Sequence, residues 1–421
     1  MADAPPPAPR AIKPQRERGY ANEHAGANGW WVDLTGETTP ELAWPLSVEV
    51  FDKMRRQDAQ VASVLRAVTA PITRTQWRLD GTSCDREVTE SVALSLGLPI
   101  LGDAPEQDPA NRLRGRDRFS WDEHLGLALL ELTFGHSYFE QVYRPDLEAT
   151  ARMGRDQYRI RKLALRPART IANIKVARDG GLEWIQQHGS TLDQSKSPKL
   201  PVNRLVAYVL EREGSNWLGR SLLRSAYKNW LLKDRALRTW STSIDRNGIG
   251  VPIYTAAPGE KSLDDGEELA TSVRSGENAG GAIPNEAKLE LIGVKGQTVN
   301  IAEFVRYQDE QIARSALGHF LNLGSQGGGQ VGSYNYGSVL ADTFNLSLDV
   351  IARQIAETAT AHIVEDLVDI NFGPTTPAPR LVYDEIGTRV SELDRAREAA
   401  GLESDADLVK FLRSIPDQEV A

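Results

Sequence analysis

Histidine and cysteine are the side chains that most often hold metals or act as nucleophiles, and this chain has few of them. It contains 6 histidines and 1 cysteine. The histidines share no metal-ligand spacing and form no HExxH motif; they are His24, His124, His136, His188, His319 and His362. Cys84 stands alone, which excludes a disulfide framework or a thiolate metal cluster and is typical of a reducing compartment. The sequence therefore predicts no metal and no cofactor.

Two short motifs are similar to catalytic loops, but each lacks a required residue. The glycine-rich loop Gly324–Gly332 lacks the Lys-Ser/Thr pair of a phosphate-binding loop, and it follows a predicted helix rather than a strand. Residues Gly135–Phe139 begin like a nucleophile elbow, but Phe139 occupies the place of the closing glycine. Acidic residues predict a solvated helix face at Asp264, Asp265, Glu267 and Glu268. We expect no catalytic residue; an enzyme whose acid and base groups are unmarked in the sequence is the alternative.

The charge balance limits how the chain could meet nucleic acid. It has 421 residues, of which 49 are basic and 58 acidic, with a net charge of −9. A chain that coats nucleic acid over its whole surface would be basic, so any contact with DNA has to be local and cationic. The proline-rich, basic residues 1–45 have no apolar core and predict a flexible arm rather than a signal peptide. No apolar run is long enough for a membrane span, so we expect a soluble, intracellular protein without a membrane partner.

A long amphipathic helix at 219–246 places the cations of interest. The segment has no proline and no internal glycine, and Asn247-Gly248 supplies a stop signal. At about 100° per residue it has a cationic sector and an opposite apolar sector, over a length of about 40 Å. The cationic sector holds Arg220, Arg224, Lys228, Leu231, Arg235, Arg238 and Arg246. The apolar sector holds Ala226, Trp230, Leu237, Trp240 and Ile244, joined by Lys233.

We predict two roles for this helix. Subunit packing is assigned to Trp230, Leu237, Trp240 and Ile244. Contact with DNA in a lumen, or with a neighbour's carboxylates, is assigned to Lys228, Lys233, Arg235 and Arg238. An ordinary amphipathic helix with a solvated basic face fits the same pattern.

The remaining elements predict an α+β protein. Before the long helix we expect helices at Ser47–Val68, 85–98 and Trp121–Thr133, the last capped by Ser120, with strands between and after them. A small α/β excursion follows at 247–298. Further helices are then predicted at Asn300–Phe320 and Ser338–Ile370, separated by the glycine-rich loop.

The order of these elements, with several local phrases, resembles the portal proteins of tailed bacteriophages, most closely the Mu-type branch. The phrases extend over roughly residues 46–385 and include Met54–Asp58, Trp77, Leu218–Arg224, Trp230–Lys233, Asp245–Gly248, Val251-Pro252, Leu317-Gly318 and Asp369–Gly373. Two features depart from the family. Leu218-Gly219 stands where the family usually has Tyr-Gly, and the tunnel loop is unusually rich in glycine.

The resemblance implies a portal-like subunit with an α+β wing, a two-helix stem, a small α/β clip, a long wing helix and a short helical crown. Laid on this chain in order, the parts are a flexible arm (1–45), the first part of the wing (46–218), a stem helix (219–246), the clip (247–298), the second stem helix (299–320), the tunnel loop (321–337), the long wing helix (338–377) and the crown or C-terminal tail (378–421).

The resemblance also implies a function. Such subunits form a ring, usually of twelve copies, at one capsid vertex, through which double-stranded DNA is packaged and ejected without sequence preference. Expected partners are the terminase large subunit, neck or head–tail adaptor proteins and the major capsid protein. The protein would be found in the virion, and in the host cytoplasm during assembly. The alternative is a structural adaptor ring that does not itself conduct DNA.

The tunnel loop is expected to be a mobile collar around DNA. Gly327, Gly328 and Gly329 leave the backbone without a preferred conformation. Weak hydrogen bonding or stacking to DNA is assigned to Gln326, Gln330, Tyr334, Asn335 and Tyr336.

Overall fold

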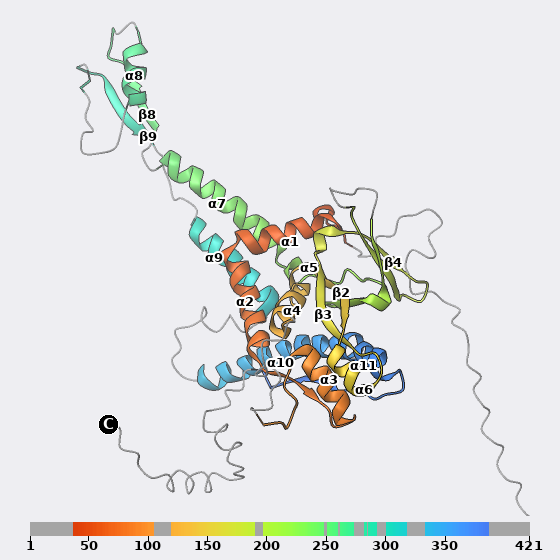
Figure 1. The fold of residues 1–421 in the computed structure, drawn as a ribbon. Coiled ribbons are helices and arrows are strands. Elements are labelled where there is room, and N and C mark those ends of the chain that lie inside the picture. Colours follow the sequence, from red (N-terminus) through yellow and green to blue (C-terminus); the bar gives the residue numbers. More distant parts are fainter. Residues whose placement is uncertain are drawn as a thin grey trace, which may run out of the picture. The chain divides into compact units, whose positions relative to one another are not determined.

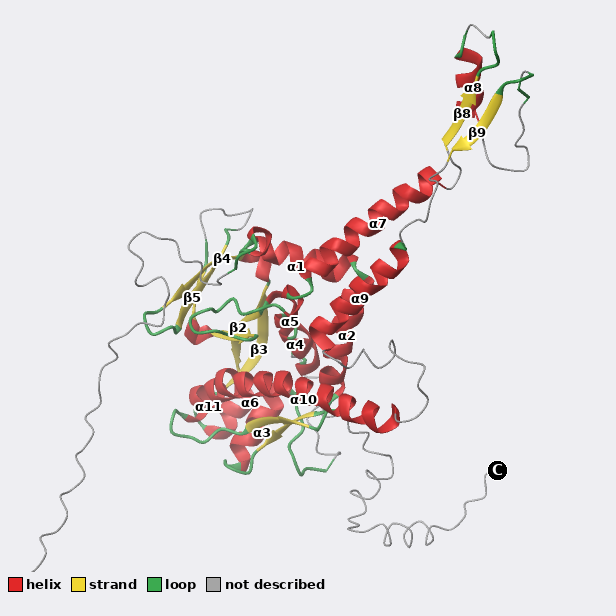
Figure 2. Ribbon diagram, turned by 180° about the vertical axis from the view of Figure 1, so that it is seen from behind, coloured by secondary structure: helices red, strands yellow, loops and turns green. Residues whose placement is uncertain are grey.

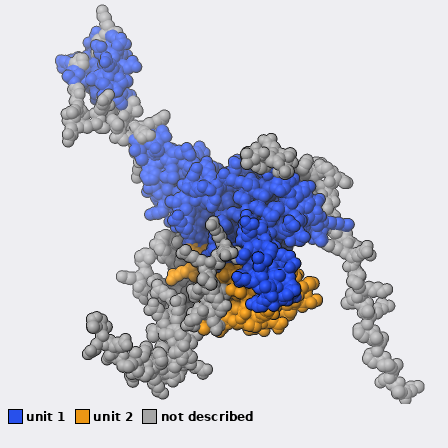
Figure 3. Space-filling view, in the orientation of Figure 1, with its two compact units in different colours: residues 1–69, 116–329 blue, residues 70–115, 330–421 orange. Residues whose placement is uncertain are grey.

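The structure is a computed structural model that describes residues 37–104, 119–189, 197–247, 251–259, 262–272, 282–283, 285–292, 300–317 and 333–386. It is 52% helical and 20% strand, which confirms the α+β class. The chain divides into two compact units (Figure 3): unit 1 holds residues 1–69 and 116–329, and unit 2 holds residues 70–115 and 330–421. Residues 70–115 thus group with the part of the chain that includes the predicted long wing helix (338–377).

Unit 1 begins with two helices in place of the predicted single helix 47–68. They are α1 (Leu46–Gln57) and α2 (Ala59–Arg74), whose last turn belongs to unit 2 (Figure 1). Asp58 between them has extended backbone angles of φ −107° and ψ 119°. Its carboxylate accepts hydrogen bonds from the backbone N–H of Gln60 (2.8 Å) and Val61 (3.1 Å). Asp58 thus caps the start of α2, and the helix breaks because the aspartate satisfies amides that would otherwise have no partner.

Two three-stranded antiparallel sheets follow in unit 1. One has the order β3-β2-β7, from β2 (His136–Pro145), β3 (Tyr158–Arg166) and β7 (Leu205–Val209). The other has the order β4-β5-β6, from β4 (Ile171–Val176), β5 (Leu182–Gln187) and β6 (Lys199–Pro201). A core joins the two sheets through Tyr138, Ile171, Leu182, Ile185, Leu200 and Leu205. The sequence did not predict β4 or the short helix α6 (Leu147–Met153).

The predicted helix Trp121–Thr133 is divided into α4 (Trp121–Ala128) and α5 (Glu131–Phe134). Its predicted cap is confirmed, because the Ser120 hydroxyl accepts a hydrogen bond from the Glu123 backbone N–H at 3.4 Å. Gly135, at φ +87°, ends α5 and leads directly into β2.

The predicted stem helices are α7 (Tyr227–Asn247) and α9 (Ile301–Leu317), which pack on each other. The first begins at Tyr227 and not at residue 219, because residues 219–226 form a turn and the short 3₁₀ helix Leu222–Arg224. Between them lie β8 (Val251–Thr255), α8 (Asp264–Ser272) and β9 (Lys288–Ile292) (Figure 2). β8 and β9 pair antiparallel. A Cβ at Gly266 of α8 would collide with the Tyr254 ring of β8, so glycine lets α8 pack closely on this hairpin.

Unit 2 consists of segments from far apart in the chain. It holds α3 (Arg86–Leu96), α10 (Ser333–Ala359), a π-helical turn (Thr360–Val364) and α11 (Glu365–Phe372). Its strands β1 (Trp77–Asp80) and β10 (Arg380–Tyr383) pair antiparallel, with Trp77 opposite Tyr383. β10 lies inside the predicted crown, so the first residues of that segment are part of unit 2; residues 387–421 lie outside the described residues.

The predicted flexible arm is too long at its C-terminal end. Residues 1–36 lie outside the described residues, but Leu42 is buried in the core of unit 1 and lies in a short 3₁₀ helix, Pro40–Leu42. Glu37 forms an ion pair with Arg224 at 2.5 Å. Residues 37–45 are therefore part of the folded unit.

Candidate functional site: the helix pair α7–α9

A cluster of three charges joins α7 and α9 to the start of α2; Lys233 and Asp58 are buried, and Asp309 is partly exposed. The Lys233 Nζ of α7 lies 2.9 Å from Asp58 Oδ2 and 2.5 Å from Asp309 Oδ1 of α9. Lys233 is only 8% exposed. Burial by itself lowers the pKa of Lys233, but the bonds to Asp309 and Asp58 outweigh it and the net shift is upward. The lysine therefore stays charged and holds two carboxylates from different elements.

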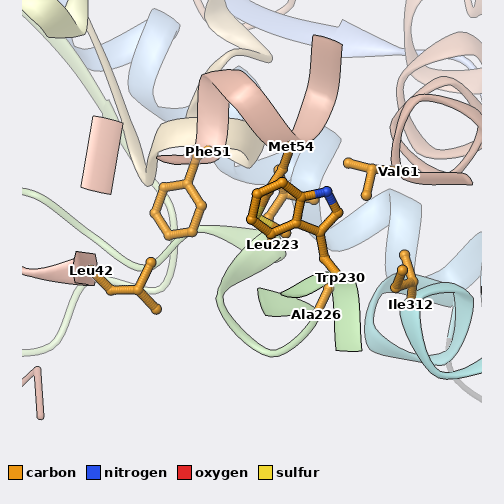
Figure 4. Close-up of a cluster of buried hydrophobic side chains, with 8 residues drawn as sticks. All are labelled: Leu42, Phe51, Met54, Val61, Leu223, Ala226, Trp230 and Ile312. Atoms are coloured by element: carbon orange, nitrogen blue, oxygen red, sulfur yellow. The ribbon is translucent and has the colours of Figure 1, made fainter. Parts of the chain in front are cut away.

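Trp230 fills the apolar core beside this cluster. Figure 4 shows its side chain directed from α7 toward Phe51 and Met54 of α1. The same core includes Leu223 and Ala226, which precede α7, and Ile312 of α9. Trp230 is 7% exposed and Met54 is fully buried. The first turns of α7 are thus anchored inside the subunit.

Beyond these first turns, α7 and α9 carry exposed apolar side chains on two surfaces. The Phe304 surface is a groove of about 330 Å³ lined by Leu232, Arg235, Ala236, Thr239, Ile301 and Phe304. The Trp240 surface is a shallower hollow of about 220 Å³ lined by Leu237, Trp240, Ser241 and Ile244. Ile244 is 58% exposed, Leu237 42% and Phe304 41%, whereas Trp240 is half-buried. Apolar side chains exposed in this way are typical of an interaction surface.

Exposed cations follow a third face of α7. Lys228, Arg235 and Arg238 are all exposed. At about 100° per residue they lie within a sector of about 80°. Arg238 forms an ion pair with Asp234 at 2.9 Å, one turn earlier on the same helix.

A close crossing of two backbone segments positions the chain before α7. A Cβ at Gly135 would lie 2.5 Å from the Leu218 carbonyl oxygen, and one at Gly219 would collide with the Gly135 carbonyl oxygen. The Leu210 N–H donates to the Gly135 carbonyl at 2.9 Å, and the Arg220 N–H donates to the Leu210 carbonyl at 2.9 Å. This crossing fixes where the chain leaves the β3-β2-β7 sheet toward α7.

His124 and His136 are buried and hydrogen-bonded within the fold. His136 donates from Nδ1 to the Leu218 carbonyl at 3.0 Å, and His124 Nε2 lies 2.9 Å from the Tyr208 hydroxyl. Burial lowers the pKa of His124 to about 3, and burial, partly offset by the bond to Leu218, lowers the pKa of His136 to about 4. Both rings are therefore neutral at pH 7. Among the described residues, no group of three or more His, Cys, Asp or Glu side chains is arranged to hold a metal ion.

The described helices are also too short or too polar to cross a membrane, since none combines the necessary length and hydropathy.

Comparison with known protein families identifies the family to which the chain belongs. The family model of the portal protein of Mu bacteriophage matches residues 48–412. The chain belongs to this family. The match spans most of the chain, and it confirms the resemblance found in the sequence.

Solved structures agree at the level of the fold. A chain from the virion of a native gene transfer agent particle matches with a TM-score of 0.54 and 13% identity, covering 89% of this chain and 95% of the other. The neck of the empty gene transfer agent particle, computed with C6 symmetry, gives 0.54 and 13%, with 87% and 94% covered. The neck of the native particle, computed with C12 symmetry, gives 0.52 and 13%, with 87% and 94% covered. At this identity the likeness shows a shared fold.

The structure divides the predicted site residues of this portal subunit into two that have partners inside the subunit and others that remain candidates for outside contacts. Trp230 packs in its own subunit rather than against a neighbouring stem, and Lys233 is paired inside the subunit rather than free for DNA. Both predictions were wrong for the same physical reason: α1 and α2 cover the first turns of α7. Leu237, Trp240 and Ile244 remain candidates for packing, and Lys228, Arg235 and Arg238 remain candidate cations.

The predicted tunnel loop stays largely a prediction. Gln326, Gly327, Gly328, Gly329 and Gln330 lie outside the described residues, whereas Tyr334, Asn335 and Tyr336 lie in the first turns of α10. Sequence reasoning missed the partners Asp58 and Asp309. A signal for them existed, because a lysine on the apolar face of a helix needs a buried carboxylate partner.

Proposed function

We propose that copies of this portal-family chain assemble into a closed ring, of twelve subunits, that forms a channel for double-stranded DNA at one capsid vertex. Family membership over residues 48–412 supports this proposal. The related necks computed with C6 and C12 symmetry support a ring. The ring would serve DNA packaging and ejection in a virion, and the chain would pass through the host cytoplasm during assembly.

The observation that carries the proposal is the helix pair α7–α9. Its base is fixed inside the subunit by Lys233 and Trp230, while its outer turns expose apolar surfaces and a row of cations. Anchored helices with exposed apolar sides are suited to a tube built from copies. Exposed cations in a chain of net charge −9 allow local contact with phosphates and leave DNA free to slide.

The other parts of the subunit fit further partners. The clip segment carries exposed Asp264, Asp265, Glu267 and Glu268 and would meet the terminase large subunit and later the neck or head–tail adaptor proteins. The wing would meet the major capsid protein. The glycine-rich loop would be a mobile collar in the channel, without a nucleotide site. The chain would have a structural role and no catalytic activity.

Electron microscopy of the purified chain, with and without linear DNA, tests the proposal. We expect closed rings with a lumen wide enough for duplex DNA, and DNA threaded through some of them. Packaging by particles that carry Gly328→Pro tests the loop, since a stiffer loop should leave rings intact and reduce the DNA retained. Rings with a lumen narrower than duplex DNA would favour the structural adaptor. Turnover of a substrate by the isolated chain would favour an enzyme.

A further inference from the structure

A cavity of about 350 Å³ lies in unit 1 beside the first described residues of the chain. Its apolar wall consists of Leu42, Trp44, Phe51, Phe134 and Leu218. Phe51 belongs to the core around Trp230, whereas Trp44 packs against the core that joins the two sheets. The wall is therefore held in place on two sides, and the volume of the cavity is in the range of pockets that hold small ligands.

Two carboxylates lie at the rim of this cavity. Glu211 and Glu213 line it, and both are exposed. Glu211 has a φ of +46°, a left-handed conformation that residues other than glycine rarely adopt. Its cationic partner Arg220 is 3.9 Å away, which is beyond hydrogen-bonding distance. The fold thus holds a strained hydrogen-bond acceptor beside an apolar wall, and such strain is typical of a binding site.

An apolar wall beside a hydrogen-bond acceptor suits the side chain of tryptophan. Its ring is large and apolar, and its one polar group, the indole N–H, can only donate. The sequence places two such side chains, Trp30 and Trp31, shortly before Glu37, which itself lines the cavity. An extended chain spans at most about 3.6 Å per residue, so neither tryptophan can be farther than about 25 Å from Glu37. Both are therefore within reach of the cavity.

We propose that the segment Trp30-Trp31 docks in this cavity of its own subunit. One indole ring lies on the apolar wall, and its N–H donates to a carboxylate of the rim. The short linker, 32–36, keeps the segment near the cavity at an effective concentration on the order of millimolar, which favours the chain's own tryptophans over those of another molecule. The basic residues at 10–18 fit less well, because a cationic group could pair with the rim but would leave the apolar wall uncovered. A single subunit suffices for this contact, so it is independent of the ring.

A thiol at the rim tests whether this segment covers the cavity. Ser225 lines the cavity and is exposed, so Ser225→Cys in the full-length chain places a reactive group there. Its reaction with N-ethylmaleimide is followed by peptide mass spectrometry in dilute, monomeric chain, with Cys84 of unit 2 as the internal reference. Trp30→Ala and Trp31→Ala together should raise the rate at position 225 about tenfold, because burial of one large apolar side chain shifts an open–closed equilibrium by at least this factor. The rate at Cys84 should not change.

Tyr20→Ala is the matched control, because it removes an aromatic side chain of the same arm outside the proposed segment. It should leave the rate at position 225 unchanged. Equal rates for the control and the tryptophan variant would overturn the docking, since these tryptophans would then not cover the cavity. Slow labelling found only in assembled rings would also overturn it, because a neighbouring subunit would then be the cover. Either result leaves the proposed ring standing, whereas slow labelling in monomers that never assemble would support the docking and contradict the ring.

Discussion

Gly135 and Gly219 cross so closely that neither position has room for a side chain. A Cβ at Gly135 would lie 2.5 Å from the Leu218 carbonyl oxygen, and Gly219 faces the carbonyl oxygens of Gly135 and Leu210. Both glycines also have positive φ, +87° and +64°. The chain reaches α7 only by passing through this crossing. The departure from the family's usual Tyr-Gly at Leu218-Gly219 therefore changes the first residue and keeps the glycine that the crossing requires.

Gly219→Ala should destabilise unit 1 more than the backbone angle alone explains. The strain of a positive φ costs about 1–2 kcal/mol, and the collision with two carbonyl oxygens adds to it. The matched control is Gly154→Ala, where φ is +68° but no atom lies within 4 Å of the new Cβ. Urea unfolding measures both. Equal losses of unfolding free energy for the two variants would show that the crossing relaxes.

Lys233→Met should be strongly destabilising. It leaves Asp58 and Asp309 near each other without their cation, and removal of one member of a buried ion pair typically costs about 3–5 kcal/mol. The matched control is Arg238→Met on the same helix, which breaks an exposed, solvent-screened pair with Asp234 and should change stability little. Thermal melting of the two variants should differ clearly. A loss for Lys233→Met as small as that of the control would mean that the three charges are solvated.

Trp230→Ala should lower the stability of the subunit, whereas Trp240→Ala should lower ring assembly, although both residues lie on one side of α7. Trp230 is buried against α1, and truncation of such a residue costs about 3–5 kcal/mol of subunit stability. Trp240 is half-buried, so its truncation should leave subunit stability nearly unchanged and reduce the fraction of chains in rings. Melting of dilute subunits and ring counts from micrographs measure the two effects. Equal stability of the two variants would contradict the assignment of Trp230 to the subunit core.

Alkaline pH should weaken unit 2 through Tyr383. Burial and a hydrogen bond to Asp349 (2.8 Å) raise the pKa of Tyr383 from its ordinary 10.0 to about 12. A folded-state pKa above the unfolded value gives stability that is fully present below pH 10 and is lost as the pH rises to about 12. Tyr383→Phe removes this hydrogen bond and this ionisation. We expect the variant to be less stable than the wild type at pH 9 and the difference in unfolding free energy to shrink toward pH 12. A constant difference over this range would show that the pKa of Tyr383 is the same in the folded and unfolded states, so that it is not raised by folding.

The amphipathic pattern of α7 was predictable from the sequence, but the partners of its apolar side were not. Trp230, Lys233 and Trp240 share one side of the helix by spacing alone. Which of them is buried in the subunit depends on α1, which packs on Trp230, and on Asp58 before α2, which pairs with Lys233. Helical periodicity shows that an apolar face must be buried, but it does not show which element packs against that face. For that reason Trp230 was assigned to a neighbouring subunit and Lys233 to DNA or a neighbour's carboxylates, whereas both have their partners within the subunit.

Two further features could not be predicted from local sequence: the break between α1 and α2, and the pairing of β1 with β10. The apolar spacing continues from α1 into α2, so the sequence alone predicts one helix; only the capping bonds of Asp58 and its pairing with Lys233 reveal the break. The strand β1 was predicted, but its partner β10 was not, because β10 falls in a segment assigned to a helical crown. A pairing over such a distance in sequence leaves no periodic signal in either segment.

The pairing of β1 with β10 has a consequence for synthesis of the chain. The Thr75 hydroxyl, just before β1, donates to the Asp384 carbonyl, just after β10, over a separation of 309 residues. At about 5–20 residues per second, translation completes β1 about 15–60 s before β10 leaves the ribosome. In the folded chain Leu79 pairs with Ile100 along one edge of β1, so until β10 is made the other edge lacks its strand. Arg78 and Asp80 lie on β1 itself, and charges on an open edge discourage pairing with another chain. We therefore expect these charges to protect the open edge of β1 from aggregation until β10 has been synthesised.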